Sequence, residues 1–236
     1  MKNLNKIVVL GLACMIALGS CNKNKPVKVK LGSDIDSVSY CLGLSIGKSL
    51  RDGAKLEKIN TKLMAKAIEQ VFDKDSVPFN DMKINEVIQV YMMKQHQKVS
   101  GQNMKIGQDF LSKNKTKSGV ISLPSGLQYK VITDGNGPVP KATDMVAVHY
   151  KGMSINGKIF DKQEGKDSAK FVVNQVIPAW TEILQKMKVG SKWTIYVPAN
   201  LAYGERGAGN VIEPNETLIF DIELLKILPA PKAVKK

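Results

Sequence analysis

The 236-residue chain can form one large domain or two small ones, and its hydrophobic fraction of 43% excludes a chain that is disordered throughout. A formal net charge of +14 is typical of proteins that bind nucleic acids, but the lysines are scattered along the whole sequence. Neither an RNA-binding aromatic signature nor a zinc-finger spacing lies between them, so we expect solvated basic faces and no nucleic-acid partner.

The N-terminus predicts export from the cytoplasm. Lys2 and Lys6 precede an apolar run over residues 7–18, about a dozen residues, whereas roughly 20 are needed to span a bilayer. We therefore expect a signal peptide at residues 1–20. Its end, Leu18-Gly19-Ser20-Cys21, resembles a bacterial lipobox, which implies that Cys21 carries lipid and anchors the protein to a membrane. The alternative is an ordinary signal peptide with an incidental cysteine.

Cys41 would be the only thiol left in the mature chain, since Cys14 leaves with the signal and Cys21 is acylated. An internal disulfide is then impossible. We expect Cys41 to be a small buried hydrophobic residue on a helix, in preference to a redox or intersubunit role.

Helical periodicity begins after a basic tether at residues 21–33. An apolar face over residues 38–46 predicts one helix, and a second, capped by Asn60, repeats apolar residues at helical spacing through Phe72. These two short helices make a poor core alone. We therefore predict that residues 34–79 form a helical dimerisation domain, and that a homodimer forms through residues 34–93.

A long connecting helix is predicted over residues 80–116. It would start at Asn80 or Asp81 and extend for about 50 Å at 1.5 Å per residue. Its first half carries apolar residues, whereas residues 94–109 are mostly polar. This composition predicts a solvent-bridging arm.

The remainder, residues 117–228, alternates apolar and polar residues at the period of half-buried strands. Asn156-Gly157 between two such strands predicts a two-residue hairpin turn. Residues 176–187 form the exception, because Trp180, Ile183, Leu184 and Met187 fall on one helical face. Pro178 suits the first helical position and Gly190 the C-terminal cap. The predicted fold class is α+β, with an antiparallel half-barrel wrapped around one short helix. A basic tail, residues 229–236, ends the chain.

Residues for bond-cleaving chemistry are not apparent. His96 and His149 lie outside any metal-ligand spacing, and neither a nucleophile elbow nor a paired cysteine and histidine is present. The glycine-rich stretch 203–210 lacks the following helix and the Lys-Ser/Thr pair of a phosphate-binding loop. We expect neither a metal nor a cofactor. The candidates that remain are aromatic and aliphatic side chains at strand ends and turns, for which plain core packing is an equal alternative from spacing alone.

Five blocks of sequence decide between these alternatives. They are Val148-His149-Tyr150, Gly157-Lys158-Ile159-Phe160-Asp161, Val176-Ile177-Pro178-Ala179-Trp180, Ala202-Tyr203-Gly204 and Thr217-Leu218-Ile219-Phe220-Asp221-Ile222-Glu223-Leu224-Leu225. In order and spacing, over residues 124–228, the chain resembles the FKBP-type peptidyl-prolyl cis-trans isomerases. Tyr40-Cys41-Leu42-Gly43 and Ser125-Gly126-Leu127-Gln128-Tyr129 are similar to the macrophage infectivity potentiator branch. That resemblance implies dimerisation through an N-terminal helical domain and a long connecting helix.

The resemblance also implies the site. A half-open barrel would hold a prolyl ring over the indole of Trp180, with Asp161 as the carboxylate at the rim. The other catalytic residues implied are Tyr150, Phe160, Val176, Ile177, Tyr203 and Phe220, and Phe171, Val211 and Ile212 would add to the substrate pocket. The Ile177 N–H and the Tyr203 hydroxyl would anchor substrate carbonyls.

We expect a lipid-anchored isomerase that rotates X-Pro bonds and assists the folding of exported proteins in the bacterial cell envelope, at an outer membrane and facing the periplasm. Its partners would be proline-containing unfolded or folding polypeptides. The alternative is a holding chaperone that binds unfolded envelope proteins with little isomerase activity. A third hypothesis, adhesion to an anionic surface through the lysines, predicts steep salt dependence and indifference to Trp180.

Overall fold

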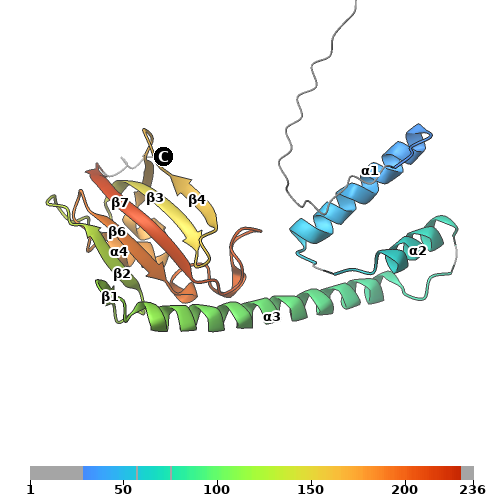
Figure 1. Ribbon diagram of the computed structural model, residues 1–236, viewed down its shortest axis with the longest axis horizontal. Helices are drawn as coiled ribbons and strands as arrows, with labels where there is room; N and C mark the ends of the chain where they lie inside the picture. Colours follow the sequence, from blue (N-terminus) through green and yellow to red (C-terminus); the bar gives the residue numbers. More distant parts are fainter. Residues whose placement is uncertain (1–28, 57, 75, 230–236) are drawn as a thin grey trace, which may run out of the picture. The chain divides into compact units, whose positions relative to one another are not determined.

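The computed structural model describes residues 29–56, 58–74 and 76–229. The chain divides into two compact units, residues 1–57 and 58–236 (Figure 1). The expected signal peptide, the lipidated Cys21, most of the tether and the tail from residue 230 onward lie outside the described residues. Within the described ranges, no helix has both the length and the hydropathy needed to cross a membrane.

The first unit consists of helix α1 (Asp34–Lys48) followed by a short π-helical turn, η1 (Ser49–Gly53). The Ser33 hydroxyl accepts a hydrogen bond from the Asp36 N–H at 3.2 Å and so caps the helix start. Cys41 is exposed, so the prediction of a buried cysteine is wrong. The reason is that the described residues of this unit form no second layer over α1, which buries none of its residues.

The second unit opens with two helices that both begin at an asparagine. The Asn60 side chain accepts from the Leu63 N–H at 3.0 Å and caps α2 (Thr61–Phe72), as predicted. Asn80 caps α3 (Asp81–Asn114) in the same way through the Lys83 N–H at 2.9 Å. The predicted long connecting helix is therefore confirmed, within two residues at its end.

The remainder of this unit is an antiparallel sheet. Its strands are β1 (Val120–Ser122), β2 (Gln128–Thr133), β3 (Met145–Ser154), β4 (Ile159–Gln163), β5 (Ala169–Val172), β6 (Lys192–Val197) and β7 (Leu218–Leu228). The strand order is β1-β2-β6-β7-β3-β4, and β5 also pairs with β3. Three short turns complete the unit: η2 (Val173–Gln175), η3 (Ala199–Leu201) and η4 (Gly204–Arg206). Strand β1 was not predicted, because three residues are too few to display a period.

One helix, α4 (Pro178–Leu184), packs against this sheet. Pro178 occupies its first turn as predicted, but α4 has seven residues, fewer than the three turns expected. Gly190 does not cap it. Gly190 instead lies in the turn that leads into β6, where it has a positive φ of 91°. The Gly190 N–H donates a hydrogen bond to the Leu224 carbonyl at 2.8 Å. Met187 reaches the core from the irregular segment that follows the helix.

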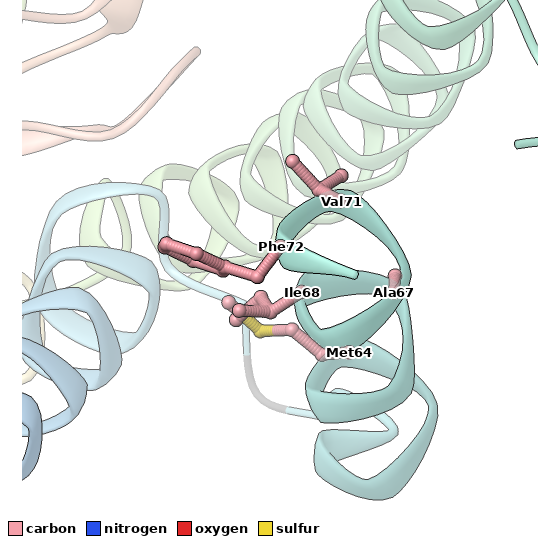
Figure 2. Close-up of a pocket in the computed structure, with 5 residues that line it drawn as sticks. All are labelled: Met64, Ala67, Ile68, Val71 and Phe72. Carbon is pink, nitrogen blue, oxygen red and sulfur yellow. The ribbon is translucent and has the colours of Figure 1, made fainter. Parts of the chain in front are cut away.

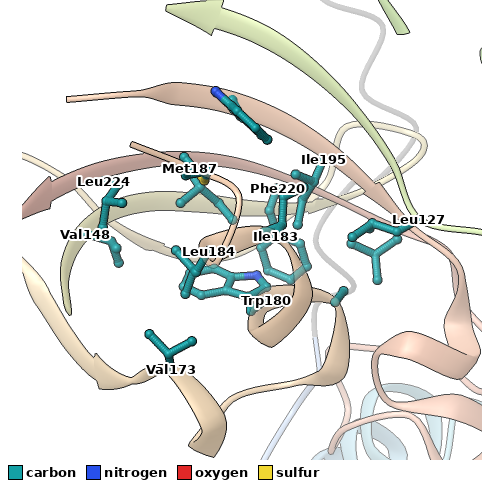
Figure 3. Packing of buried hydrophobic residues seen from close by; sticks show 14 of the residues in the cluster. Leu127, Val148, Val173, Trp180, Ile183, Leu184, Met187, Ile195, Phe220 and Leu224 are labelled. Carbon is teal, nitrogen blue, oxygen red and sulfur yellow. The ribbon is translucent and has the colours of Figure 1, made fainter. Parts of the chain in front are cut away.

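The hydrophobic core lies between α4 and the concave face of the sheet (Figure 3). Trp180, Ile183 and Leu184 from α4 meet inward-facing residues of β3, β6 and β7. The alternation predicted for the last two strands is confirmed, since the following residues are buried: Trp193, Ile195, Val197, Leu218, Phe220, Ile222 and Leu224. This core places the start of α4 beneath the sheet.

The β3–β4 connection differs from the predicted two-residue turn. Met153 pairs with Ile159, which leaves five residues between the paired positions. The Gly157 N–H donates to the Ser154 carbonyl at 2.9 Å, so Asn156-Gly157 closes a longer turn in which Gly157 takes the positive φ of 84°. Phe160 and Asp161 lie on the returning strand β4, where Asp161 pairs with Gly152 and Phe160 falls at a shift in register.

The prediction of a solvent-bridging arm is wrong for the C-terminal part of α3. Gly107 and Asn114 are buried there, and the Phe110 ring lies 6.0 Å from that of Tyr196 on β6. The Gln128 side chain donates to the Leu111 carbonyl at 3.0 Å and accepts from the Asn114 amide at 3.0 Å. Gly107 and Asn114, together with the Phe110 ring, therefore pack this helix face against the sheet.

Candidate active site

The indole of Trp180 is the centre of an aromatic cluster. Trp180 lies in the first turn of α4. The Thr181 hydroxyl in the same turn donates a hydrogen bond to the Val173 carbonyl at 2.8 Å. The rings of Tyr150, Phe171 and Phe220 stand nearly perpendicular to the indole, at interplanar angles of 84°, 84° and 85°. Their centroids lie 5.2, 5.5 and 5.6 Å from it, within the range of favourable edge contacts. Trp180 is 4% exposed, so it forms the bottom of the cluster.

Phe160 extends the cluster from β4. Its ring centroid is 5.7 Å from that of Phe220, again nearly perpendicular at 86°. Both rings occupy space that a side chain at Gly152 would take, because a Cβ there would lie 2.7 Å from Phe160 and 2.8 Å from Phe220. Gly152 is thus a site residue that sequence reasoning missed. Its signal was a glycine inside a strand, which often marks close approach by another group.

One carboxylate lies at the edge of the rings. The Tyr150 hydroxyl donates a hydrogen bond to Asp161 Oδ2 at 2.5 Å. The pKa of Tyr150 lies well above its ordinary value. Burial is the largest cause, and this hydrogen bond and the charge of Asp161 raise the pKa further. Burial and the same carboxylate also raise the pKa of Tyr203. Both phenols therefore remain neutral hydrogen-bond donors at physiological pH.

The rim is aliphatic. Val176 and Ile177 are half-buried against the core just before α4, and Ile212 is 4% exposed and belongs to the core itself. Within the described part of the chain, the Ile177 N–H donates no hydrogen bond. Val211 is 53% exposed and lies outside the hydrophobic cluster. Tyr203, which is 39% exposed, also lies outside this cluster, whereas the other predicted aromatic and aliphatic pocket residues belong to it.

The histidines lie apart from these rings. His149 Nδ1 is 3.7 Å from a carboxylate oxygen of Glu223 on β7, and His96 is on α3. In the described ranges, no group of three or more His, Cys, Asp or Glu side chains is placed to hold a metal ion. The aromatic cluster thus combines apolar surface with neutral hydroxyls and one rim carboxylate. Such a site can bind a small apolar ring and donate hydrogen bonds to nearby carbonyls.

A half-barrel that gathers four aromatic rings around and beside the indole at the start of one short helix is suited to contact a small apolar ring of a polypeptide. Comparisons with known proteins make the class specific. A family model described as "FKBP-type peptidyl-prolyl cis-trans isomerase" matches residues 137–225, and one described as "Domain amino terminal to FKBP-type peptidyl-prolyl isomerase" matches residues 35–131.

Relatives match over almost the whole chain. "Outer membrane protein MIP" of Legionella longbeachae is 38% identical over 231 residues, covering 94% of this chain and 96% of the relative. The isomerase FkpA of Escherichia coli (strain K12) is 32% identical over 259 residues, with coverage of 100% and 95%. The crystal structure of FkpA from Escherichia coli is similar with a TM-score of 0.66 at 31% identity, covering 86% of this chain and all of that one. The chain therefore belongs to the FKBP-type peptidyl-prolyl cis-trans isomerases.

Proposed function

We propose that this protein catalyses rotation about X-Pro bonds in exported polypeptides of the cell envelope, with the prolyl ring held over Trp180. The observation that carries the proposal is the set of three rings nearly perpendicular to the indole, with the Tyr150 hydroxyl and the Asp161 carboxylate beside them. Tyr150, Phe160, Phe171 and Phe220 are its walls. The Ile177 N–H and the Tyr203 hydroxyl are the donors for substrate carbonyls.

The physical basis is selective binding of the twisted amide. Resonance holds the X-Pro bond planar with a barrier of about 18–20 kcal/mol, and uncatalysed exchange takes about tens to hundreds of seconds. At the transition state this resonance is lost and the carbonyl is less polar than in the planar amide. A desolvated cup therefore favours the twisted form without any acid or base, and each 1.4 kcal/mol of preference gives about tenfold in rate.

Isomerase activity on a short X-Pro peptide tests this function. Tyr203 is 39% exposed, so Tyr203→Ala removes a rim group without opening a core cavity. We expect kcat/KM to fall about tenfold or more, with an unchanged unfolding midpoint. Tyr196→Phe is the matched control, because Tyr196 lies on β6 and packs against Phe110. An inactive wild-type protein, or full activity in Tyr203→Ala, would refute the assignment. The holding-chaperone alternative predicts no peptide activity but suppressed aggregation of an unfolded client.

We also propose that the protein is a homodimer in the envelope, attached by lipid on Cys21. Apolar residues of α2 support the first point: Met64, Ala67, Ile68, Val71 and Phe72 line a shallow pocket on this helix (Figure 2). None of the residues of α2 is buried by its own unit. The lipobox-like Leu18-Gly19-Ser20-Cys21 and the outer-membrane name of the Legionella relative support the anchor. Incorporation of labelled fatty acid, abolished by Cys21→Ala, would test it.

A further inference from the structure

The loop that joins β6 to β7 carries part of the proposed site and is held from behind by α3. Residues 198–217 form this loop, with Tyr203 at the rim and Ile212 in the core. The Asn103 amide of α3 donates to the Pro214 carbonyl at 3.0 Å and to Glu213 at 3.3 Å. The Asn215 amide donates in turn to the Ser100 hydroxyl at 2.7 Å. Helix and loop are therefore joined by side chains more than 100 residues apart in the sequence.

The backbones also approach closely at this junction. Gly107 is buried, and a Cβ there would lie 2.2 Å from the Thr217 hydroxyl oxygen. Ser100, Asn103 and Gly107 are spaced i, i+3 and i+7, and Asn114 continues the same stripe seven residues later. The polar half of α3 is thus a docking face for the loop. The hydrophobic pattern did not reveal it, because its members are serine, asparagine and glycine.

Asn215 also forms a hydrogen bond to the backbone beside Tyr203. Its own N–H donates to the Gly204 carbonyl at 2.8 Å, and Gly204 directly follows Tyr203. Asn215 has a positive φ of 54°, a conformation that asparagine tolerates better than most residues. Two hydrogen bonds therefore lead from the Ser100 hydroxyl through Asn215 to the carbonyl of Gly204, the residue next to Tyr203.

We infer that the Ser100–Asn215 contact is a positioning device for the isomerase site, through which α3 holds Tyr203 in place to meet the substrate. Ser100 and Asn215 act through Tyr203 and do not touch the substrate themselves. The inference rests on the proposed role of Tyr203. The connecting helix α3 then helps to position the isomerase site in addition to acting as a spacer.

A double-mutant cycle on kcat/KM for an X-Pro peptide tests the inference in the full chain. Ser100→Ala removes the acceptor, and we expect kcat/KM to fall about fivefold, as for loss of one hydrogen bond. In a Tyr203→Phe background the same change should have less than a twofold effect, because the group being positioned is gone. Ser112→Ala, an exposed serine on the same helix, is the matched control and should be neutral.

Rescue separates positioning from simple loss of stability. Asn215→Gly keeps the positive φ but loses the side-chain bond, so it should match Ser100→Ala. Asn215→Asp can accept a hydrogen bond from the Ser100 hydroxyl, and so should restore most of the activity. The inference is overturned if Ser100→Ala retains full kcat/KM, or if its effect is undiminished in Tyr203→Phe. An inactive wild type would refute the isomerase function itself, and an ineffective Tyr203→Phe change beside a damaging Ser100→Ala would refute the route through Tyr203.

Discussion

Gly152 shows how one missing side chain can shape the site. The strand backbone at this position would allow a larger residue, but the neighbouring rings would not. A Cβ at Gly152 would lie 2.7 Å from the Phe160 ring and 2.8 Å from the Phe220 ring. Gly152→Ala should displace both rings, which cannot bend as a flexible side chain would. We expect kcat/KM for an X-Pro peptide to fall about tenfold and stability to fall by about 1–3 kcal/mol.

Gly101→Ala is the matched control for this change. Nothing lies within 4 Å of a Cβ at Gly101 on α3, so alanine there should be neutral or slightly stabilising. Peptide kinetics and urea unfolding followed by tryptophan fluorescence would measure both effects. If Gly152→Ala kept wild-type kinetics, the two rings would not form the wall that we assign to them.

The pH profile should distinguish this site from an acid–base catalyst. Burial and Asp161 raise the pKa of both Tyr150 and Tyr203 in the folded protein. A raised folded pKa contributes stability that is fully present below the unfolded pKa of about 10, and is lost as pH rises through the folded pKa. We therefore expect kcat/KM to stay flat from about pH 6 to 9 and to decline only in more alkaline solution.

Tyrosinate absorbance recorded beside the kinetics would check the assignment. Activity should be lost only at the high pH at which the tyrosines with raised pKa ionise. The part of the absorbance change that appears at this pH should be smaller in Tyr150→Phe. A bell-shaped profile centred near neutrality would contradict the mechanism, because it would require a titrating acid or base in the chemical step.

Individual site residues were predicted to unequal degrees. Apolar alternation located the strands, and the resemblance of five blocks selected Trp180 and its neighbours from among ordinary core residues. Gly152 and Asn103 were missed, because close approach and long-range amide contacts leave no periodic trace in a sequence. The pocket role of Val211 stays a prediction: Val211 is 53% exposed and Ile212 is 4% exposed, and their order in the sequence does not reveal which of the two side chains faces the core.

At the scale of elements, the end of α3 depends on a buried pair of amides. Asn114 is fully buried and donates to Gln128, which in turn donates to the last turn of the helix at Leu111. Asn114→Ala would leave the Gln128 oxygen without this donor. We expect a loss of about 1–3 kcal/mol from the unpaired Gln128 oxygen. The better helix propensity of alanine and the removal of Asn114 Oδ1, which is buried without a hydrogen-bond partner among the described residues, offset part of this loss.

Gln102→Ala provides the comparison, since Gln102 is exposed on the same helix. Urea denaturation of both variants, monitored by tryptophan fluorescence, should lower the midpoint for Asn114→Ala alone. Equal midpoints would mean that this end of α3 contributes nothing to the stability of the sheet unit.

Helix boundaries were predicted well where a cap determines them. Asn60 and Asn80 each satisfy a free N–H, and this local chemistry is visible in the sequence. The end of α4 was misplaced, because Met187 continues the helical spacing and is buried although the helix has already ended at Leu184. Burial of a residue and its helical state are separate properties, and periodicity reports only the first.

For the whole molecule, the exposed apolar face of α2 is one of the features that a single chain leaves unexplained. Phe72 is 81% exposed and Ile68 44% exposed, and both face the same shallow pocket (Figure 2). Phe72→Glu should not harm the fold of a lone chain, since no part of its own unit buries the ring. In a dimer the new carboxylate would have to be buried unpaired, so we expect the variant to sediment as a monomer at micromolar concentration.

Lys66→Glu is the matched control, because it introduces the same side chain on the opposite face of α2 and should leave the dimer intact. Peptide isomerisation should be unchanged in both variants, since every ring of the aromatic cluster comes from the sheet and α4 of the same chain. A wild-type protein that sediments as a monomer, or a dimer that persists in Phe72→Glu, would contradict an interface at this face.

The same pair of variants separates catalysis from chaperone activity. A site that holds one prolyl ring cannot shield the long apolar stretches of an unfolded client, whereas the larger surface of a dimer can. We therefore expect the monomeric Phe72→Glu protein to keep its kcat/KM on peptides but to lose much of its ability to suppress client aggregation, measured by light scattering. If suppression survives in the monomer and disappears in Tyr203→Ala, the isomerase cup itself is where unfolded chains bind.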